Sequence, residues 1–272
     1  MLTMKEKTKT RLKTPITYYG GKQGMLRHIR PLIPEHDLYC ESFAGGAAVF
    51  FDKEPVKVNV INDLNGELIN FYKTVVNHFE ELCHEISNTL HSRNQHAHAW
   101  YIYNNPDYFS NIQRAWAVFI LSKLGFAGQL SGSFGFDKSE GRHSRKMRLA
   151  VEVFTQELKL LLQHSTIECD DAFTIIKRYD CPHAWHFIDP PYVDSNMGHY
   201  SGMFNEQCLM DLLELCSNLQ GKFMLTMYPN EAIQQYAVNN NWIIHKVERQ
   251  ISACRAESRR RQEEWMVCNY TI

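Results

Sequence analysis

Long hydrophobic runs are missing from this chain of 272 residues. No apolar stretch reaches the roughly 18 residues that a membrane-spanning helix needs. The basic and polar segment 1–13 also lacks the apolar core of a secretory signal peptide. We therefore expect a cytoplasmic protein with no membrane partner, and a disordered tail over residues 1–13.

Paired cysteine motifs are missing too, although the chain contains 8 cysteines. No two of them form a Cys-x-x-Cys pair, which argues against a zinc ribbon and a thioredoxin-type redox site. His96 and His98 could suggest a metal, but no third ligand stands near them in the sequence. We therefore predict that the cysteines are reduced and behave as small buried hydrophobic residues, and that the protein binds no metal.

An excess of charge of one sign is also lacking, because the formal net charge is -1. This balance excludes a protein that is basic over its whole surface, but it allows a local basic patch for nucleic acid. The hydrophobic fraction of 44% is sufficient for a buried core. The length fits one large α/β domain with a smaller insertion.

Strand and helix patterns alternate in two parts of the chain, 14–81 and 164–272. The alternation predicts a mostly parallel sheet covered on both faces, which binds ligands at the carboxyl ends of its strands. Short apolar or valine-rich runs predict the strands. These are residues 38–40, 56–61, 166–169, 185–188, 222–227, 242–247 and 264–272.

The middle of the chain, residues 82–163, shows no strand alternation. Apolar residues at helical spacing predict one helix that contains 112–120 and another that contains 151–162. A Gly-, Ser- and Phe-rich segment and a basic run lie between them. We interpret 82–163 as a mostly helical domain inserted between the two halves of the sheet.

The sharpest motif is Asp189-Pro190-Pro191-Tyr192, which directly follows the predicted strand 185–188. Two prolines can simply end a strand, but the four residues together favour a catalytic site. The exocyclic amine of a nucleobase is a poor nucleophile because its lone pair is delocalised into the ring. The Asp189 carboxylate and the Pro190 carbonyl can accept its hydrogens, and Tyr192 can stack on a flipped base.

Acidic or glycine-containing segments follow three other predicted strands. The small residues of 41–47 allow a ligand to approach the backbone closely. Asp63 stands about 20 residues after this turn, where an acid can bind ribose, although it could equally cap a helix. Asp170 or Asp171 could bind an adenine amine or cap the next helix, and spacing does not separate the two.

The order of these motifs resembles that of the Dam-like N6-adenine DNA methyltransferases, from residue 15 to residue 270. A P-loop is excluded, because the segment 18–22 lacks the required spacing. The matching motifs are Tyr18-x-Gly-Gly-Lys22, Glu41-x-Phe43-x-Gly45, Asn62-Asp63 and Asp189-Pro-Pro-Tyr192. Ser42 stands where the family often has proline, and Ala47 where it often has glycine.

This resemblance implies a Rossmann-like methyltransferase fold of the α/β class with S-adenosylmethionine as cofactor. Its sulfonium methyl is already electrophilic, so that positioning and charge supply the rate. The family places Asp63 at the ribose, Asp171 at the adenine, and Asp189 at both cofactor and target amine. The remaining implied cofactor residues are Tyr18, Lys22, Glu41, Phe43 and Gly45.

The insertion also contains the predicted DNA contacts. Phe134 and Phe136 are predicted to be apolar tips that could wedge into a base stack. Basic runs are often simply solvated, but this one follows a glycine-rich loop and suits DNA phosphates. Its cations are Arg142, Arg145, Lys146 and Arg148. A second basic cluster, at 255–261, is the alternative.

We therefore predict a site-specific adenine-N6 methyltransferase that flips its target base out of double-stranded DNA. A restriction-modification system or a phage is the expected source. The alternatives are a cytosine-N4 methyltransferase, an enzyme that acts on RNA, and an inactive DNA-binding relative. Asp189 in place of a serine favours adenine, and the intact motif favours an active enzyme. The oligomeric state is not indicated.

Overall fold

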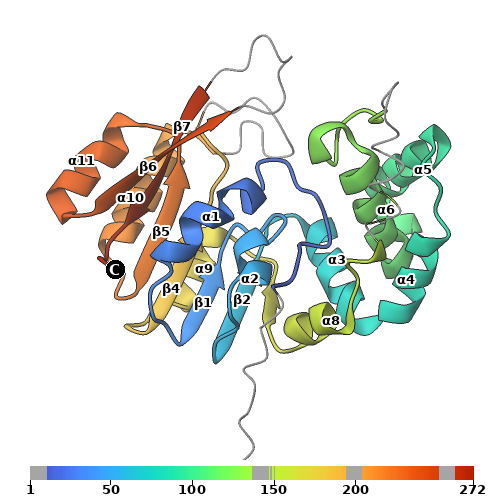
Figure 1. Cartoon of the computed structure of the whole chain (residues 1–272), viewed down its shortest axis with the longest axis horizontal. Helices are drawn as coiled ribbons and strands as arrows, with labels where there is room; N and C mark the ends of the chain where they lie inside the picture. Colours follow the sequence, from blue (N-terminus) through green and yellow to red (C-terminus); the bar gives the residue numbers. More distant parts are fainter. Residues whose placement is uncertain (1–10, 137–146, 148, 150, 194–203, 251–260) are drawn as a thin grey trace, which may run out of the picture.

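The computed structural model describes residues 11–136, 147, 149, 151–193, 204–250 and 261–272, so most of the predicted tail lies outside it. These residues form a seven-stranded sheet with the strand order β3-β2-β1-β4-β5-β7-β6 (Figure 1). The strands are β1 Leu38–Glu41, β2 Val58–Asn62, β3 Thr166–Glu168, β4 Ala184–Ile188, β5 Lys222–Met227, β6 Ile243–Gln250 and β7 Arg261–Cys268.

The sheet is mostly parallel, as the sequence predicts. Strands β3, β2, β1, β4 and β5 run in one direction, and β7 runs antiparallel to both of its neighbours. The order reverses between β1 and β4, which is where α/β sheets bind ligands. Strand β7 ends at Cys268 rather than at residue 272, because its partner β6 begins opposite Cys268, at Ile243.

Both faces of the sheet are buried. Successive side chains of a strand point to opposite faces, so each strand contributes to the core on both sides. On one face, Trp185 and Phe187 join the core that includes helices from the first half of the chain. On the other face, Phe223 and Leu225 pack with the helices that follow β3. This double cover explains why β4 is buried along its whole length. The strand therefore reads as a continuous apolar run.

Helices cover the sheet and also form a lobe beside it, on the right of Figure 1. Those packed on the first face are α1 Leu26–Ile29, which lies between the short η1 Lys22–Met25 and η2 Arg30–Leu32, and α2 Ala48–Asp52. Those on the other face are α9 Ala172–Arg178, α10 Glu206–Ser217 and α11 Glu231–Asn240. The lobe contains α3 Gly66–Asn77, α4 Phe79–Ser87, α5 Arg93–Asn104, η3 Pro106–Tyr108, α6 Asn111–Leu124, η4 Phe126–Gly128 and α8 Gln156–Gln163.

Side-chain caps define most helix starts, which the sequence indicates by Ser, Thr, Asn or Asp. Ser110 begins α6 with a capping box that includes Gln113, and Asn205 begins α10 as predicted. The single helix predicted over 151–162 is wrong at its start. Thr155 caps α8 instead, and Phe154 lies in the turn before it, with its N–H bonded to the Val151 carbonyl.

The described part of 82–163 is helical, and apart from an isolated bridge between Gly125 and Phe134 it contains no β pairing. Its rings continue the core of the sheet: Phe154 packs against Phe119 of α6 and Phe71 of α3. The predicted boundary at residue 82 falls inside α4. The lobe and the sheet therefore share one core.

Because of this shared core, Phe119→Ala should lower the free energy of unfolding of the whole chain by about 3–5 kcal/mol. Phe119 is fully buried, so that the truncation leaves a cavity. Val238→Ala on α11 is the matched control, because Val238 is 72% exposed, and it should change the free energy by less than about 0.5 kcal/mol. Urea denaturation followed by circular dichroism measures both, and equal midpoints for the two variants would contradict the shared core.

Candidate active site

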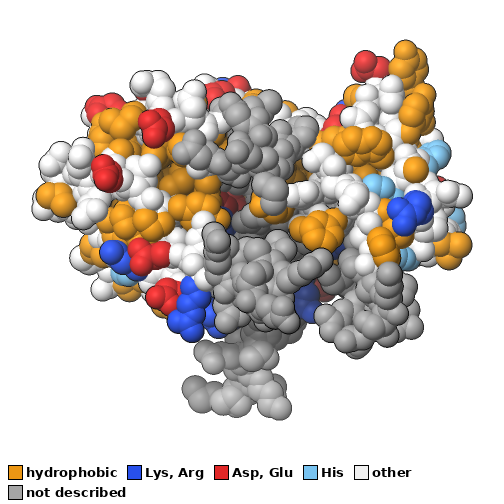
Figure 2. All heavy atoms as spheres, turned by 90° about the horizontal axis from the view of Figure 1, so that it is seen from above, with side chains coloured by type: hydrophobic (Ala, Val, Ile, Leu, Met, Phe, Trp, Pro, Cys, Tyr) orange, Lys and Arg blue, Asp and Glu red, His pale blue; other side chains and the backbone are white. Residues whose placement is uncertain are grey.

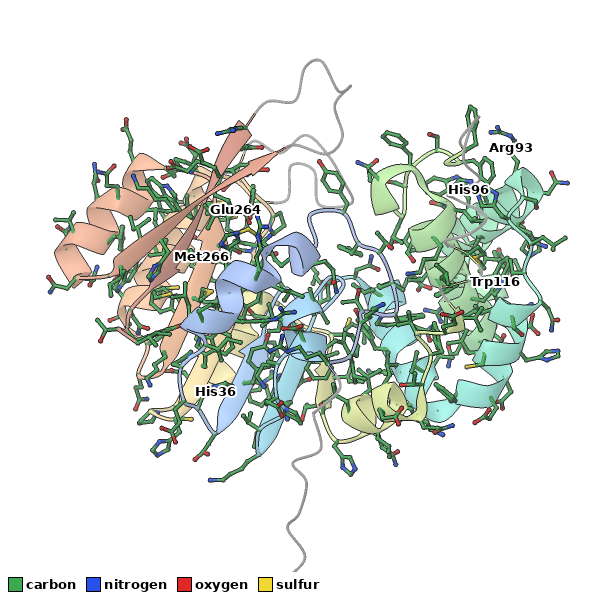
Figure 3. The ribbon with its side chains drawn as sticks, in the orientation of Figure 1. His36, Arg93, His96, Trp116, Glu264 and Met266 are labelled. Carbon is green, nitrogen blue, oxygen red and sulfur yellow. The ribbon has the colours of Figure 1, made fainter. Side chains whose placement is uncertain are left out.

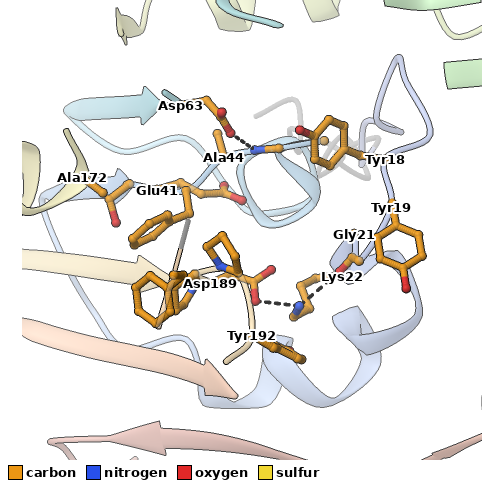
Figure 4. Close-up of a pocket in the computed structure, with 18 of the residues that line it drawn as sticks. Tyr18, Tyr19, Gly21, Lys22, Glu41, Ala44, Asp63, Ala172, Asp189 and Tyr192 are labelled. Carbon is orange, nitrogen blue, oxygen red and sulfur yellow. Dashed lines mark hydrogen bonds and ion pairs between the residues drawn. The ribbon is translucent and has the colours of Figure 1, made fainter. Parts of the chain in front are cut away.

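A cavity of about 340 Å³ opens at the carboxyl ends of the parallel strands, which is large enough for a small-molecule cofactor. Figure 4 shows how segments distant in sequence meet around it. The structure brings together every residue that the sequence predicts for the cofactor and for catalysis. They are Tyr18, Lys22, Glu41, Phe43, Gly45, Asp63, Asp171, Asp189, Pro190 and Tyr192.

The loop after β1 reaches the cavity through a backbone that suits small residues. Gly45 has a φ of +48°, and a Cβ there would lie 2.9 Å from a carbon of the Tyr18 ring. Its carbonyl accepts a hydrogen bond from the Tyr72 hydroxyl at 2.7 Å. Ala47 is also left-handed, with a φ of 51°, which costs a residue with a Cβ about 1–2 kcal/mol. The loop is therefore shaped for close backbone approach.

Asp63 fixes this loop from the end of β2. Its Oδ2 accepts the Gly45 N–H at 2.8 Å, and its Oδ1 accepts the Asn65 N–H at 2.9 Å. Asn65, not Asp63, caps α3. The simple capping alternative for Asp63 is therefore wrong, and its predicted contact with a ribose stays a prediction.

The two acids after β3 have different surroundings. Asp170 pairs with Arg178 at 3.1 Å and does not line the cavity. Asp171 lines the cavity and caps α9 by accepting the Thr174 N–H at 3.0 Å. Geometry thus separates the neighbours where spacing could not, and it favours Asp171 as the cofactor residue.

Asp189 stands at the end of β4 beside a buried cation. Lys22 Nζ lies 2.6 Å from Asp189 Oδ1, and Thr226 Oγ1 donates to the same oxygen at 2.6 Å. Burial raises the pKa of Asp189 and Glu264 adds to this, while Lys22 and Thr226 act in the opposite direction. Among the described residues, the two donors to Asp189 are Lys22 and Thr226, and both bind Oδ1. The carboxylate is therefore held in one orientation.

Tyr192 continues the wall of the cavity. Its hydroxyl donates to Glu264 Oε1 at 2.7 Å, and its ring packs edge-on against Tyr228 with centroids 4.2 Å apart. Lys22 Nζ lies 5.0 Å from the centre of the Tyr192 ring. The ring is thus fixed at its hydroxyl and at its edge, in a place where it could support a planar ligand.

Glu41 is buried beneath the cavity, with only 2% exposure. Its Oε2 accepts hydrogen bonds from the Tyr39 hydroxyl at 2.7 Å and from the Phe50 N–H at 3.0 Å. Burial raises the pKa of Glu41 to about 8. These bonds join β1 to α2, so that the side chain supports the loop from below. Its contact with the cofactor stays a prediction.

The two predicted apolar tips, Phe134 and Phe136, differ in their burial, and their contact with DNA stays a prediction. The partly buried Phe134 ring packs against His91, with centroids 5.0 Å apart, and against the Arg93 guanidinium at 4.9 Å. The His96 ring packs edge-on against the Phe134 ring, with centroids 5.8 Å apart, and Figure 3 shows His96 and Arg93 near each other in the helical lobe. Of the two predicted tips, Phe136 is the exposed one, at 58%. The predicted phosphate contacts Arg142, Arg145, Lys146 and Arg148 lie outside the described residues.

The residues that sequence reasoning missed include Thr226, which bonds Asp189, and Tyr228 and Glu264 of the cavity wall. Glu264 does leave a signal, because it is an acid directly before the apolar run 265–268. Thr226 is likewise the polar member of a buried strand. Tyr228 follows that strand without any pattern to mark it.

Over the part of the chain that the structure describes, no group of three or more His, Cys, Asp and Glu side chains is arranged to hold a metal ion. Nor does any described helix combine the length and the apolar character that crossing a bilayer requires.

Comparison with known proteins shows the family to which the chain belongs. The chain is 25% identical over 288 residues to the Type II methyltransferase M1.LlaDCHI of Lactococcus lactis subsp. cremoris, with 99% of each chain covered. It is 26% identical over 206 residues to the Type II methyltransferase M.MjaIII of Methanocaldococcus jannaschii, covering 68% of this chain and 71% of that protein.

A shorter match is closer in sequence. The chain is 46% identical over 56 residues to the DNA N-6-adenine-methyltransferase of Escherichia phage P1, which covers 21% of this chain and 7% of the phage protein. The model of one family, described as D12 class N6 adenine-specific DNA methyltransferase, matches residues 18–252. The chain therefore belongs to the D12 class of N6 adenine-specific DNA methyltransferases and methylates adenine in DNA.

Proposed function

We propose that this enzyme takes its methyl group from S-adenosylmethionine and transfers it to an adenine that is flipped out of double-stranded DNA. The observation that carries the proposal is the oriented Asp189 carboxylate at the end of β4, inside the cavity. Lys22 and Thr226 both bind Oδ1, which leaves Oδ2 to accept a hydrogen of the target amine.

The charges of the cavity fit this donor. Four acidic side chains besides Glu41 line it, and among the described lining residues only Lys22 is a cation. S-adenosylmethionine carries a sulfonium and an ammonium, so that an acidic cavity attracts it. The acids are Asp63, Asp171, Asp189 and Glu264. In this assignment Asp63 accepts from the ribose hydroxyls and Asp171 from the adenine amine.

The bound donor supplies an electrophilic methyl group on sulfur. Asp189 Oδ2 accepts one hydrogen of adenine N6 and the Pro190 carbonyl accepts the other, so that the nitrogen becomes pyramidal and its lone pair is available. A carbon–nitrogen bond then forms as the carbon–sulfur bond breaks, with its electron pair left on sulfur. The nitrogen loses a proton, for which the Asp189 carboxylate is an available acceptor. Tyr192 supports the flipped base by stacking.

We assign DNA binding to the segment 131–148 of the sequence. On the face drawn in Figure 2, the described Lys and Arg side chains are scattered and form no continuous patch. The sequence concentrates positive charge in the run 142–148, whose cations can neutralise several phosphates.

A role in restriction-modification is proposed from the names of two relatives, which are Type II methyltransferases. In such a system, methylation protects host DNA from a partner endonuclease that cuts the same sequence. The phage protein makes a phage role the second candidate. A neighbouring endonuclease gene would support the first role and oppose the second.

The donor assignment predicts that the protein binds S-adenosylmethionine in the presence of a chelator. Asp63→Ala should weaken this binding by about 1.5–3 kcal/mol, the scale of lost charged hydrogen bonds. Asp170→Ala is the matched control and should bind normally, because Asp170 does not line the cavity. Isothermal titration calorimetry measures both variants. A requirement for a divalent ion, or equal losses in both variants, would contradict the assignment.

The catalytic assignment predicts that Asp189→Ala loses at least about a hundredfold in turnover while it stays folded. Glu264 still lies 3.5 Å from Lys22, so the cation keeps a partner. Because burial raises the pKa of Asp189, the wild-type rate should fall on acidification at a higher pH than an ordinary aspartate gives. Transfer of a labelled methyl group to DNA measures both the turnover of the variant and the pH dependence of the wild type. The exposed Asp211→Ala is the control, and a folded Asp189→Ala protein with near-normal turnover would refute the role.

The DNA assignment predicts that replacing Arg145 and Lys146 together by Ala flattens the plot of log affinity against log salt by about 2 units. Cofactor affinity should not change. Replacing Lys57 and Lys222 removes the same charge at the amino ends of β2 and β5, opposite the cavity, and should leave the slope unaltered. If the first pair also leaves it unaltered, the run is only a solvated surface, and the cluster 255–261 becomes the next candidate.

A further inference from the structure

Arg93 is an exposed cation at the start of α5, in the helical lobe. Its guanidinium carbon lies 4.9 Å from the centre of the Phe134 ring and 5.8 Å from the centre of the Phe136 ring. A guanidinium within about 6 Å of an aromatic ring is attracted to the face of that ring. The two rings therefore hold the guanidinium in place, although the side chain is exposed.

No described Asp or Glu pairs with Arg93, and in this it differs from other arginines of the structure. Four of them each form an ion pair with a carboxylate, namely Arg30, Arg114, Arg178 and Arg261. A phenyl ring accepts no conventional hydrogen bond, so the N–H donors of Arg93 can still bind an anion. A phosphate matches the fork of these donors, because it can accept two parallel hydrogen bonds.

The loop that carries the two rings also forms part of the cavity wall. Residues 128–130 line the cavity, and the loop is closed by the bridge between Gly125 and Phe134. Leu130 is four positions before Phe134, which keeps their Cα atoms within about 14 Å of each other. Arg93 is therefore held a short distance from the cavity by the same loop.

Arg93 also lies at the edge of the molecule toward which the cavity opens. Figure 3 shows it at the upper edge of the lobe, whereas His36, just before the amino end of β1, lies toward the lower edge of the sheet. The cavity is at the carboxyl ends of the strands, on the upper side. One turn of B-DNA is about 34 Å long. A duplex whose flipped base enters the cavity therefore passes within one turn of Arg93.

We propose that Arg93 binds a phosphate of the DNA backbone and so positions the duplex over the cavity. Phosphate contacts fix the register of a protein on DNA without reading its sequence. Because Phe134 and Phe136 hold the guanidinium before DNA arrives, little side-chain freedom is lost on binding. The proposal rests on the proposed assignment of DNA binding to the segment 131–148, which contains both rings, and it adds a contact from α5.

The test measures how salt weakens DNA binding by Arg93→Gln, which lacks the charge. The plot of log affinity against log salt should flatten by about 0.9 units, the value for one phosphate. From 50 to 200 mM salt, the wild type should therefore lose about three- to fourfold more affinity than the variant. Fluorescence anisotropy of a labelled duplex that the enzyme methylates gives both values. Arg93→Lys keeps the charge and should keep the slope, and the affinity for S-adenosylmethionine should not change.

Lys57→Gln is the matched control, because it removes one positive charge just before the amino end of β2, opposite the cavity. The Lys57 side chain is 77% exposed, and this variant should leave the slope unaltered. A second measurement needs no variant. Phenylglyoxal modifies accessible arginines, and mass spectrometry of peptides from the wild type should show that the duplex protects Arg93, whereas S-adenosylmethionine alone does not.

Three results would overturn the proposal: an unaltered slope in Arg93→Gln, equal flattening in Arg93→Lys, and equal modification of Arg93 with and without DNA. The last of these decides even if the variants do not fold. If replacing Arg145 and Lys146 flattens the slope and replacing Arg93 does not, the inference for Arg93 fails alone. If neither replacement changes the slope, the assignment of the segment 131–148 is wrong, and the inference for Arg93 fails with it.

Discussion

The site depends on the buried ion pair between Lys22 and Asp189, whose atoms lie 2.6 Å apart. It joins the segment before α1 to the end of β4, and through Lys22 and Thr226 it also reaches β7 and β5. A buried pair gains little net stability, because desolvation offsets the attraction. What it provides is orientation: Asp189 is held in one rotational position, which a carboxylate that must meet a flipped base requires.

The second constraint is the tight loop after β1, whose conformation allows a ligand to come close to the backbone. Gly45 and Ala47 both adopt left-handed conformations, and the Asp63 carboxylate holds the loop through the Gly45 N–H. Strain of this kind persists only where the surroundings enforce it. The loop and the Asp189 end lie on adjacent strands, β1 and β4, at the point where the strand order reverses. One cavity can therefore hold both the donor and the target amine.

The sequence predicts the residues that follow strands, because a strand pattern fixes which edge of the sheet they reach. Asp63 and Asp189 are found in this way. Asp170 and Asp171 are adjacent, and only the direction of each side chain separates them. Glu264 was missed because it reaches the cavity through the pairing of β7 with β5, which is not local in sequence. The packing of Phe134 on His91 and Arg93 could not be predicted, because these residues lie about 40 positions away in the sequence.

The central claim is that the clamped carboxylate in this cavity activates the exocyclic amine of adenine. The most direct measurement is mass spectrometry of nucleosides from DNA that has been incubated with the purified protein and S-adenosylmethionine bearing a deuterated methyl group. We expect labelled N6-methyladenine at one short sequence in duplex DNA, with no labelled N4-methylcytosine. Label on cytosine, or no label in DNA from a folded protein that binds the donor, would contradict it.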